Sequence, residues 1–233
     1  MMKDLDPINP QGVSSRVALR HLVVQRLLKA IIQGELAPGS RLIANKLAVR
    51  LGVSATPIRE ALVELEQSGI VQLLHHRGAL VKPFGGKELR DFYHVRALLE
   101  GEAMRLSCGR VDHEMLIALH ADLERLAGEN GDGHEKWVKE YLTLDQRIHR
   151  LAVEHCDNNR LSAEIARYYV FNETMRDLLG FNRAYHHESI VPLIDLLAAM
   201  QEQRSEACSA AMTRHIGIVA RVVEAVMFDG KKD

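Results

Sequence analysis

Two polar side chains interrupt the apolar face of a helix predicted over residues 135–155. Asp145 and His149 fall on the same stripe as Val138, Leu142 and Ala152, at alternating spacings of three and four residues. Burial of an ionised carboxylate is costly unless the group is paired or bound to a metal. Because residues i and i+4 lie side by side on a helix, the carboxylate and the imidazole could hold one cation. The same spacing is also typical of a simple ion pair, and the pattern leaves both possibilities open.

Two further polar residues interrupt apolar helical faces in the second half of the chain. His215 lies within the stripe of a helix predicted over residues 206–228, and Arg96 flanks the stripe of a helix predicted over residues 88–107. If both converge on Asp145 and His149, the four residues form a polar chamber inside a helical body. This chamber suits an anion whose carboxylate contacts a metal and a guanidinium together. The alternative is a buried ion-pair network without a ligand, in which His215 is a satisfied core residue.

Long helices must position these residues, and helical periodicity fills the chain beyond residue 88. Proline and paired glycines at residues 83–86 interrupt the pattern and mark the best domain boundary. Beyond this boundary no strand candidate remains, so we expect an all-α antiparallel bundle. The predicted helices span residues 88–107, 112–127, 135–155, 159–179, 191–204 and 206–228.

The first third of the chain has a pattern typical of a helix-turn-helix. A short helix over residues 43–51 ends at Gly52, a residue that favours the left-handed conformation of a helix end. Ser54 or Thr56 can cap the next helix, and Pro57 is tolerated in its first turn. Thr56 and Arg59 lie opposite the apolar stripe of this helix, near the end that such a motif presents to the major groove.

Two β-prone runs follow around a turn that contains Arg77 and Gly78, which is typical of a β-hairpin, or wing. A basic wing can place Arg77 and the bare backbone of Gly78 against a phosphate or in the minor groove. The predicted fold class is mainly α, with a winged helix-turn-helix and a small β-hairpin followed by the helical bundle. We expect a flexible arm at residues 1–15, a winged helix-turn-helix DNA-binding domain at 16–83, a linker at 84–87, and an all-helical effector-binding and dimerisation domain at 88–229.

Charge separates the two halves of the chain. The 233 residues carry a net charge of −1, but residues 1–84 hold 11 Lys and Arg against 6 Asp and Glu, which leaves +5 there and −6 in the rest. A basic N-terminal part and an acidic remainder are expected when only the N-terminal part contacts phosphates. We find no apolar run that could span a bilayer and no signal peptide, and expect a cytoplasmic protein without a membrane partner. Three widely spaced cysteines without a CxxC pair argue against a disulfide framework.

The motifs of the first third are specific as a set: Gly34 to Leu42 (GELAPGSRL), Leu47-Ala48, Gly52-Val53-Ser54, Thr56 to Leu62 (TPIREAL), Leu65-Glu66, Gly69 and Gly78. From about residue 19 to residue 83 the chain closely resembles the winged-helix domain of GntR-family transcription regulators. The resemblance implies that Asn45 stands where the family often has a basic residue, and Ala55 where it usually has an arginine. Because arginine is the usual bidentate partner of guanine, these two differences from the family at Asn45 and Ala55 concern which bases are contacted.

Residues beyond the boundary carry a looser set of motifs: Arg96 with Leu99-Glu100, Asp145-x-x-x-His149, Asn159-x-Leu161, Ala207, Ala211-Met212 and His215. From about residue 88 to residue 228 they resemble the FCD domain, the ligand-sensing half of the fatty-acid-regulator subfamily. The resemblance implies a divalent metal held by one Asp and three His, and Leu193 occupies the fourth ligand position. Either His186 or His187 substitutes, or water or the effector completes the shell, or no metal binds. Imidazole ligands favour zinc or nickel over magnesium.

We therefore expect a ligand-responsive transcription regulator, by default a repressor, that binds a palindromic operator as a homodimer and senses a small carboxylate. One alternative is a helical metalloenzyme in which the Asp and His cluster activates water, although no HExxH, nucleophile elbow or phosphate loop supports it. Another is an architectural DNA-binding protein without an effector. The predicted DNA contacts are Asn45, Ser54, Thr56, Pro57, Arg59, Arg77 and Gly78, the effector contact is Arg96, and the metal ligands are Asp145, His149 and His215.

Overall fold

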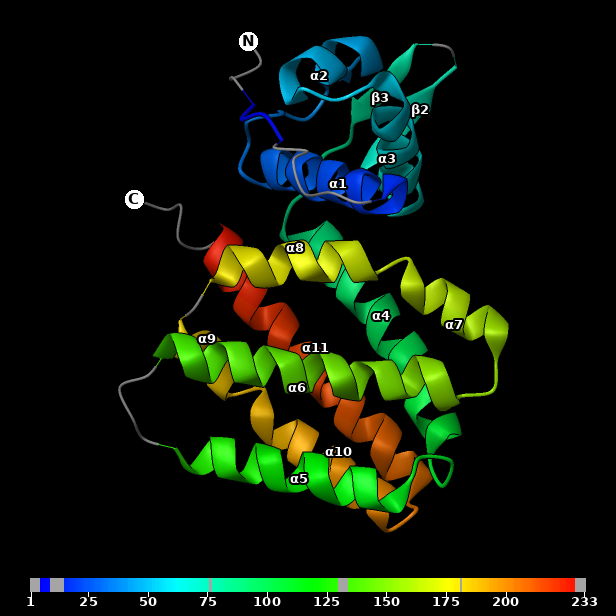
Figure 1. Cartoon of the computed structure of the whole chain (residues 1–233), viewed down its shortest axis with the longest axis vertical. Helices are drawn as coiled ribbons and strands as arrows, with labels where there is room; N and C mark the ends of the chain where they lie inside the picture. The colour runs from blue at the N-terminus through cyan, green and yellow to red at the C-terminus, as the bar shows by residue number, and fades with distance from the viewer. Residues whose placement is uncertain (1–4, 9–14, 76, 130–133, 181, 229–233) are drawn as a thin grey trace. The chain divides into compact units, whose positions relative to one another are not determined.

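A computed structural model describes residues 5–8, 15–75, 77–129, 134–180 and 182–228 (Figure 1). The chain divides into two compact units. Unit 1 takes residues 1–85 together with residues 167–178, and unit 2 takes residues 86–166 together with residues 179–233. Among the helices described, none has the length and the apolar character needed to cross a membrane.

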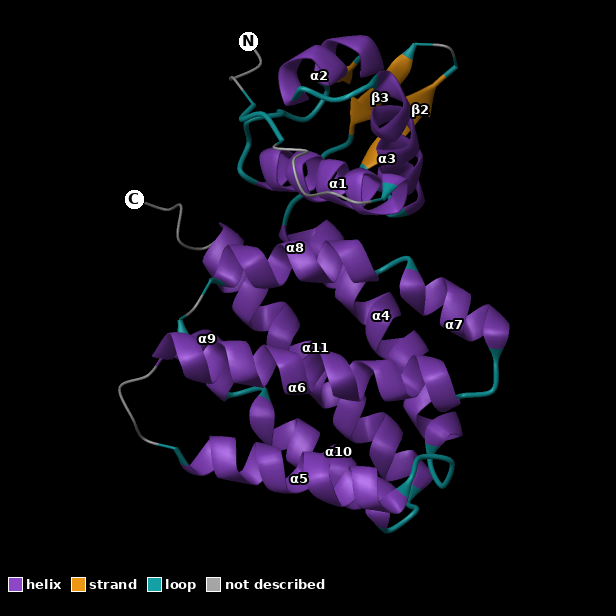
Figure 2. Ribbon diagram, viewed as in Figure 1, coloured by secondary structure: helices purple, strands orange, loops and turns teal. Residues whose placement is uncertain are grey.

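Unit 1 is built from α1 (Arg16–Ile32), β1 (Arg41–Leu42), α2 (Ala44–Leu51), α3 (Ala55–Gln67), β2 (Val71–Leu74), β3 (Gly78–Val81) and most of α8 (Tyr169–Leu179). The strands form an antiparallel sheet in which β3 lies between β1 and β2 (Figure 2). Strand β2 pairs with β3 from Val71 opposite Val81 to Leu74 opposite Gly78. This hairpin confirms the predicted wing, and the helices before it confirm the helix-turn-helix.

Local signals set the helix ends of unit 1. The Ser15 hydroxyl accepts a hydrogen bond from the Ala18 N–H (3.1 Å) and caps α1. Gly52 ends α2 in the left-handed region, with φ of 69°. Ser54 is the N-cap of α3, but its side chain makes no capping hydrogen bond. Helices α1, α2 and α3 enclose a core of buried Leu27, Leu28, Leu47, Leu51, Ile58, Leu62 and Leu65.

Two features of unit 1 differ from the expectation. Strand β1 was not predicted, because two residues are too few for a sequence pattern to indicate a strand. The predicted flexible arm is partly packed, since Leu5 is buried and the Ile8 N–H donates to the Leu51 carbonyl (3.0 Å). Residues 1–4 and 9–14 of that arm lie outside the described part of the chain.

Unit 2 is all-helical in its described residues, as predicted, and consists of α4 (Gly86–Ser107), α5 (His113–Gly128), α6 (His134–His155), α7 (Asn159–Ala166), α9 (Arg183–His187), α10 (Ile190–Gln201) and α11 (Ser205–Phe228). Helix α11 packs along α4 in the antiparallel direction, and α10 packs against α5 and α11. The approach of α4 and α11 is close. A Cβ on Gly101 would lie 2.8 Å from Thr213 Oγ1 and 3.2 Å from Ser209 Oγ.

Four expectations for the second half differ from the structure. The helix predicted over residues 159–179 is broken after Ala166, and no glycine or proline marks the break. Its second part, α8, clusters with unit 1, whereas we predicted it within the 88–229 domain. Helix α4 begins at Gly86, inside the predicted linker, and the predicted loop after residue 179 contains α9.

Candidate functional site

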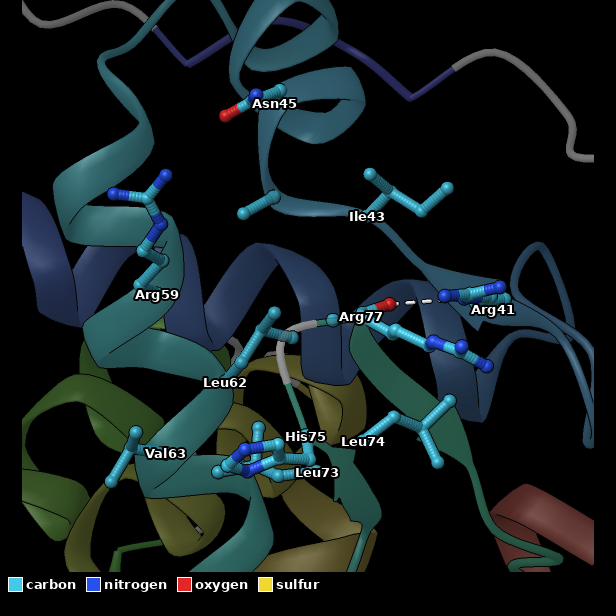
Figure 3. Close-up of a pocket in the computed structure, with 12 residues that line it drawn as sticks. Arg41, Ile43, Asn45, Arg59, Leu62, Val63, Leu73, Leu74, His75 and Arg77 are labelled. Carbon is cyan, nitrogen blue, oxygen red and sulfur yellow. Dashed lines mark hydrogen bonds between the residues drawn. The ribbon is translucent and has the colours of Figure 1, made fainter.

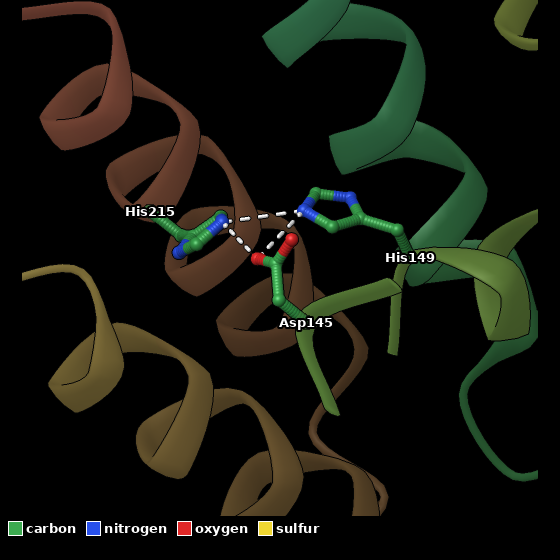
Figure 4. Close-up of side chains that lie close together, drawn as sticks. All are labelled: Asp145, His149 and His215. Carbon is green, nitrogen blue, oxygen red and sulfur yellow. Dashed lines mark hydrogen bonds and ion pairs between the residues drawn. The ribbon is translucent and has the colours of Figure 1, made fainter. Parts of the chain in front are cut away.

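Two helices of unit 2 bring the three predicted metal ligands together (Figure 4). Helix α6 carries Asp145 and His149 one turn apart, and α11 carries His215. One ligand atom from each of the three residues lies within 4.8 Å of the others. Arg96, on α4, reaches the same place, with its Nη2 3.4 Å from each ring nitrogen of His149. The structure therefore brings together the four residues from which the sequence predicted a polar chamber.

Asp145 is the centre of the cluster. Its Oδ1 lies 3.1 Å from Nε2 of His215 and 3.5 Å from Nε2 of His149. The two Nε2 atoms are 3.2 Å apart. Asp145 and His215 are buried, and the side chain of His149 is 11% exposed, so water screens this cluster little.

Partners on the far side of each imidazole fix which nitrogen faces the cluster. The Nδ1–H of His215 donates to the Ser189 carbonyl (2.9 Å), and Nδ1 of His149 pairs with the Glu100 carboxylate. These bonds assign the protons to Nδ1 and leave the lone pair of each Nε2 directed toward Asp145. Two lone pairs and a carboxylate oxygen repel one another unless a proton or a cation lies between them.

Glu100 is the member of the polar chamber that sequence reasoning did not assign a role. Its Oε1 accepts a hydrogen bond from Arg96 Nε (2.5 Å) one turn earlier on α4, while its Oε2 holds His149. Both Arg96 and Glu100 are buried. The i, i+4 spacing of Arg96 and Glu100 is the signal that could have indicated the pair. The predicted effector contact Arg96 thus already has a carboxylate partner.

The charges of the polar chamber shift its pKa values in different directions. Burial alone would raise the pKa of Glu100, but Arg96 and His149 outweigh it and hold that pKa at about 2. Burial likewise disfavours a charged His149, yet Glu100 and Asp145 outweigh it and raise the pKa of His149. Burial lowers the pKa of His215 despite the neighbouring Asp145. With neutral imidazoles the polar chamber carries one net negative charge, which either a proton on His149 or a bound cation would balance.

The donor set fits a divalent metal with nitrogen and oxygen ligands. Ligating histidines usually donate their other N–H to a carbonyl or a carboxylate, which are the partners that His215 and His149 have. A fourth protein ligand is not found among the described residues. Leu193 is fully buried, and His186 lies instead against the Gly180 carbonyl (3.2 Å).

A second site lies in unit 1, where α2, α3 and the wing surround a hollow of about 830 Å³ (Figure 3). Asn45, Arg59, Arg77 and Gly78, four of the predicted DNA contacts, line it. Arg41, the exposed first residue of β1, also lines it and was not among the predicted contacts. We call this the basic hollow, because no carboxylate is among the residues found to line it.

The other predicted DNA contacts divide by their exposure. Ser54 and Thr56 are exposed at the start of α3, near Arg59. Because Ser54 makes no capping hydrogen bond, the first N–H groups of α3 keep their capacity to donate to a phosphate. Pro57 is buried, so its ring packs within the domain and does not fit the predicted contact.

The wing is held by two contacts at its turn. Arg41 Nε donates to the Arg77 carbonyl (2.9 Å), and the Arg77 side chain remains exposed. Gly78 has φ of 89°, and a Cβ there would lie 2.0 Å from the Leu42 carbonyl oxygen. The glycine is therefore required by the close approach of β1, a structural reason separate from the predicted phosphate contact.

Two family models match the chain. The model for bacterial regulatory proteins of the gntR family matches residues 19–81, and the model for the FCD domain matches residues 91–217. The second match covers more than half of the chain and includes every residue of the polar chamber.

Named relatives and a solved structure align over most of the chain. The HTH-type transcriptional regulator McbR of Escherichia coli (strain K12) is 30% identical over 206 residues, covering 84% of this chain and 89% of the relative. The HTH-type transcriptional repressor RspR of the same strain is 24% identical over 207 residues, covering 87% and 88%. A GntR-family transcriptional regulator from Pseudomonas syringae pv. tomato str. DC3000 has a TM-score of 0.51 and 27% identity, covering 98% of this chain and 92% of that one.

Proposed function

This chain belongs to the gntR family of bacterial regulatory proteins, and we propose that it is a homodimeric repressor that a small organic acid releases from its operator. Its relatives are transcriptional regulators, which sets aside the metalloenzyme alternative. The observation that carries the proposal is the combination, in one chain, of a winged helix with a basic hollow and an FCD segment with a buried Asp–His–His cluster.

DNA binding is assigned to α3 and the wing. We place the N-terminal end of α3 in the major groove, with Arg59, Thr56 and Ser54 toward bases and phosphates. Arg77 would contact a phosphate or the minor groove from the wing, whose turn Arg41 holds in place. Asn45 lines the same hollow from α2. A single winged helix makes few base contacts, which supports two copies on a palindrome.

Effector binding is assigned to the polar chamber. Asp145, His149 and His215 would hold zinc or nickel, and the bound ion would supply open coordination positions for a carboxylate. Glu100 orients His149, Ser189 orients His215, and Arg96 keeps Glu100 ionised. The absence of a protein ligand at Leu193 leaves a position for water or for the effector. We propose a small carboxylate because the guanidinium and a metal together favour that group.

Two further proposals concern whether the protein represses or activates its genes and where in the cell it lies. The E. coli relative RspR is described as a repressor, and we extend that sign of regulation to this chain. Because we propose operator binding, we also propose a cytoplasmic location. Effector and operator then oppose each other through a coupling free energy between the polar chamber and α3.

The test begins with an operator selected from random duplexes by the full-length protein. Thermal unfolding is then measured with a panel of small carboxylic acids, with and without zinc, and each stabilising acid is added to the operator complex. We expect at least one acid to raise the melting temperature and weaken operator binding, because a ligand that binds the folded state stabilises it. His215→Ala should abolish the zinc-dependent rise, whereas His113→Ala, at an exposed position on α5, should keep it.

DNA binding has its own variant. Arg59→Ala should weaken operator binding by about 10-fold or more and leave the melting temperature unchanged, since the side chain is exposed. Unchanged binding would refute the docking of α3. Operator binding without stabilisation by any acid, with or without zinc, would instead favour an effector-free architectural protein with a closed ion-pair network.

A further inference from the structure

Two thiols that are far apart in sequence meet where α4 ends and α11 begins. Cys108 follows the last residue of α4, and Cys208 lies in the first turn of α11. The Cys208 S–H donates to Cys108 Sγ at a sulfur–sulfur distance of 3.7 Å, across a sequence separation of 100 residues. Both thiols are free. Neither belongs to the polar chamber or to the basic hollow.

We propose that Cys108 and Cys208 form a reversible redox pair, which a hydroperoxide oxidises to an intramolecular disulfide joining α4 to α11. Disulfides in reducing compartments are usually transient and redox-sensing, so such a pair is compatible with a cytoplasmic regulator. The proposal does not depend on the metal or on the effector.

The geometry allows the bond with a small movement. A disulfide needs the sulfur atoms to approach from 3.7 Å to about 2.05 Å. Cys108 lies in a turn rather than in a helix, and Gly109 after it has φ of 78°. This short connection can therefore adjust while α4 and α11 stay packed. The close approach at Gly101 already holds the two helices together two turns away.

The two thiols differ in accessibility, which orders the reaction. Cys108 is partly exposed, so its sulfur attacks the hydroperoxide, breaks the O–O bond and becomes a sulfenic acid while an alcohol or water leaves. Cys208 is buried, and its sulfur then attacks the sulfenic sulfur. The proton of Cys208 and the sulfenic hydroxyl leave as water. The pair loses two electrons, and the hydroperoxide gains them.

Direct contact with Cys108, and not its own acidity, suits Cys208 to the second step. Burial and the contact with Cys108 raise the pKa of Cys208 to about 12, against the opposing charge of Arg204. A protonated, buried thiol reacts poorly with a peroxide in solvent, but it is positioned for a sulfenic sulfur in direct contact. We therefore expect disulfide formation to accelerate as pH rises.

The disulfide would fix the position of α4 along α11. Glu100 stands eight residues before Cys108, and His215 stands seven residues after Cys208, on the same pair of helices. These two residues hold opposite sides of the polar chamber. An effect of oxidation on effector or operator affinity therefore rests on the proposed function, whereas the bond itself does not.

The experiment oxidises the full-length, fully reduced protein with hydrogen peroxide and maps its thiols. We expect maleimide labelling to lose two of the three thiols, and non-reducing peptide mapping to find one cross-linked peptide that contains Cys108 and Cys208. Dithiothreitol should restore both thiols. Cys156 is the matched control, because it is buried with its Sγ against Ser162 Oγ (3.3 Å) and has no second thiol beside it in the described residues.

Variants separate the two roles. In Cys208→Ser, Cys108 should stop at a sulfenic acid that dimedone traps, whereas Cys156→Ser should still form the cross-link. Oxidation should raise the melting temperature of the wild type and of Cys156→Ser, but not of Cys108→Ser. Wild-type protein that yields a higher oxide of Cys108, or only a cross-link between two chains, would overturn the proposal. Because peptide mapping of the wild-type protein needs no variant, it decides the proposal even if a variant proves unstable.

Discussion

Among single residues, Glu100 has the greatest influence on the polar chamber. One of its oxygens accepts from Arg96 and the other pairs with His149, so the carboxylate joins α4 to α6. The tautomer of His149 depends on this bond, because Nδ1 must carry the proton if Nε2 is to act as a ligand. In the proposed metal site, Glu100 would therefore control whether His149 can act as a ligand, without itself contacting the ion.

We expect Glu100→Gln to destabilise the protein by about 3 kcal/mol or more, because it leaves a buried Arg96 without its charged partner. Zinc affinity should fall by about 10- to 100-fold, as is usual when the partner of a ligating histidine is lost. Urea unfolding measures the first effect, and chelator competition measures the second. Glu102→Gln is the matched control, since Glu102 forms an exposed i, i+3 pair with Arg105. An equal loss in the control would contradict the role of Glu100.

The sequence alone indicated most of this site, but not all of it. Asp145, His149 and His215 were predicted because each interrupts an apolar stripe, which is a local pattern. Glu100 was not predicted, since an i, i+4 pair of Arg and Glu on a helix usually lies in solvent. Its burial is decided by α6, which approaches from a distant part of the chain. The meeting of Cys108 and Cys208 depends in the same way on the packing of α4 against α11.

At the scale of elements, α8 is the unexpected member of unit 1. Glu173 of α8 accepts from Gln25 Nε2 (3.1 Å) and pairs with His21 Nε2 (2.7 Å), both on α1. The ring of Phe171 lies 5.8 Å from that of Phe84 in an edge-to-face arrangement. Contacts with the winged helix are therefore made by a helix that the chain reaches about 80 residues after leaving that domain.

The His21–Glu173 pair should make the stability of unit 1 depend on pH. The hydrogen bond to Glu173 raises the pKa of His21 above 6.5, so its contribution is complete below pH 6.5 and is lost as the pH rises through the raised pKa. The bond to His21 lowers the pKa of Glu173 below 4.5, so its contribution is complete above pH 4.5 and is lost as the pH falls through the lowered pKa. The pair therefore stabilises most between about pH 4.5 and 6.5.

His21→Gln tests this pH window. Because both side chains are partly exposed, the loss should be about 1 kcal/mol or less at pH 5.5, and it should disappear at alkaline pH. Urea unfolding of wild type and variant at a series of pH values measures it. His113→Gln, on an exposed position of α5, is expected to show no such window. A difference that is constant from pH 5 to pH 9 would mean that the ion pair contributes nothing.

Elements were predicted where short-range signals exist. Gly52, Ser54 and the turn before Gly78 predicted the helix-turn-helix and the wing, and helical periodicity predicted the long helices. Strand β1 is defined by its pairing with β3, and α9 is a single short turn of helix. The break between α7 and α8 has no glycine or proline, so periodicity continues through it. Placement of α8 with unit 1 depends on tertiary contacts such as that of Phe171 with Phe84.

At the scale of the whole molecule, the proposed function makes operator and effector compete for the same protein. If the effector weakens operator binding by some factor, linkage requires the operator to weaken effector binding by the same factor, typically about 5- to 150-fold. Isothermal titration of the acid found by the stabilisation screen, into free and operator-bound protein, measures this. Arg59→Ala should show equal affinities with and without the duplex. Unequal factors for the two ligands in the wild type would exclude a simple coupling of the two sites.

The chain passes between its two units at residues 85/86, 166/167 and 178/179. A chimera that joins unit 1 of this chain to unit 2 of another regulator could be made at a single joint near residue 85. Here a joint near residue 85 would import a foreign α8, with no guarantee of a counterpart to Glu173 or Phe171. A working chimera must either exchange α8 together with residues 1–85 or redesign His21, Gln25 and Phe84 so that they contact the α8 of the other regulator.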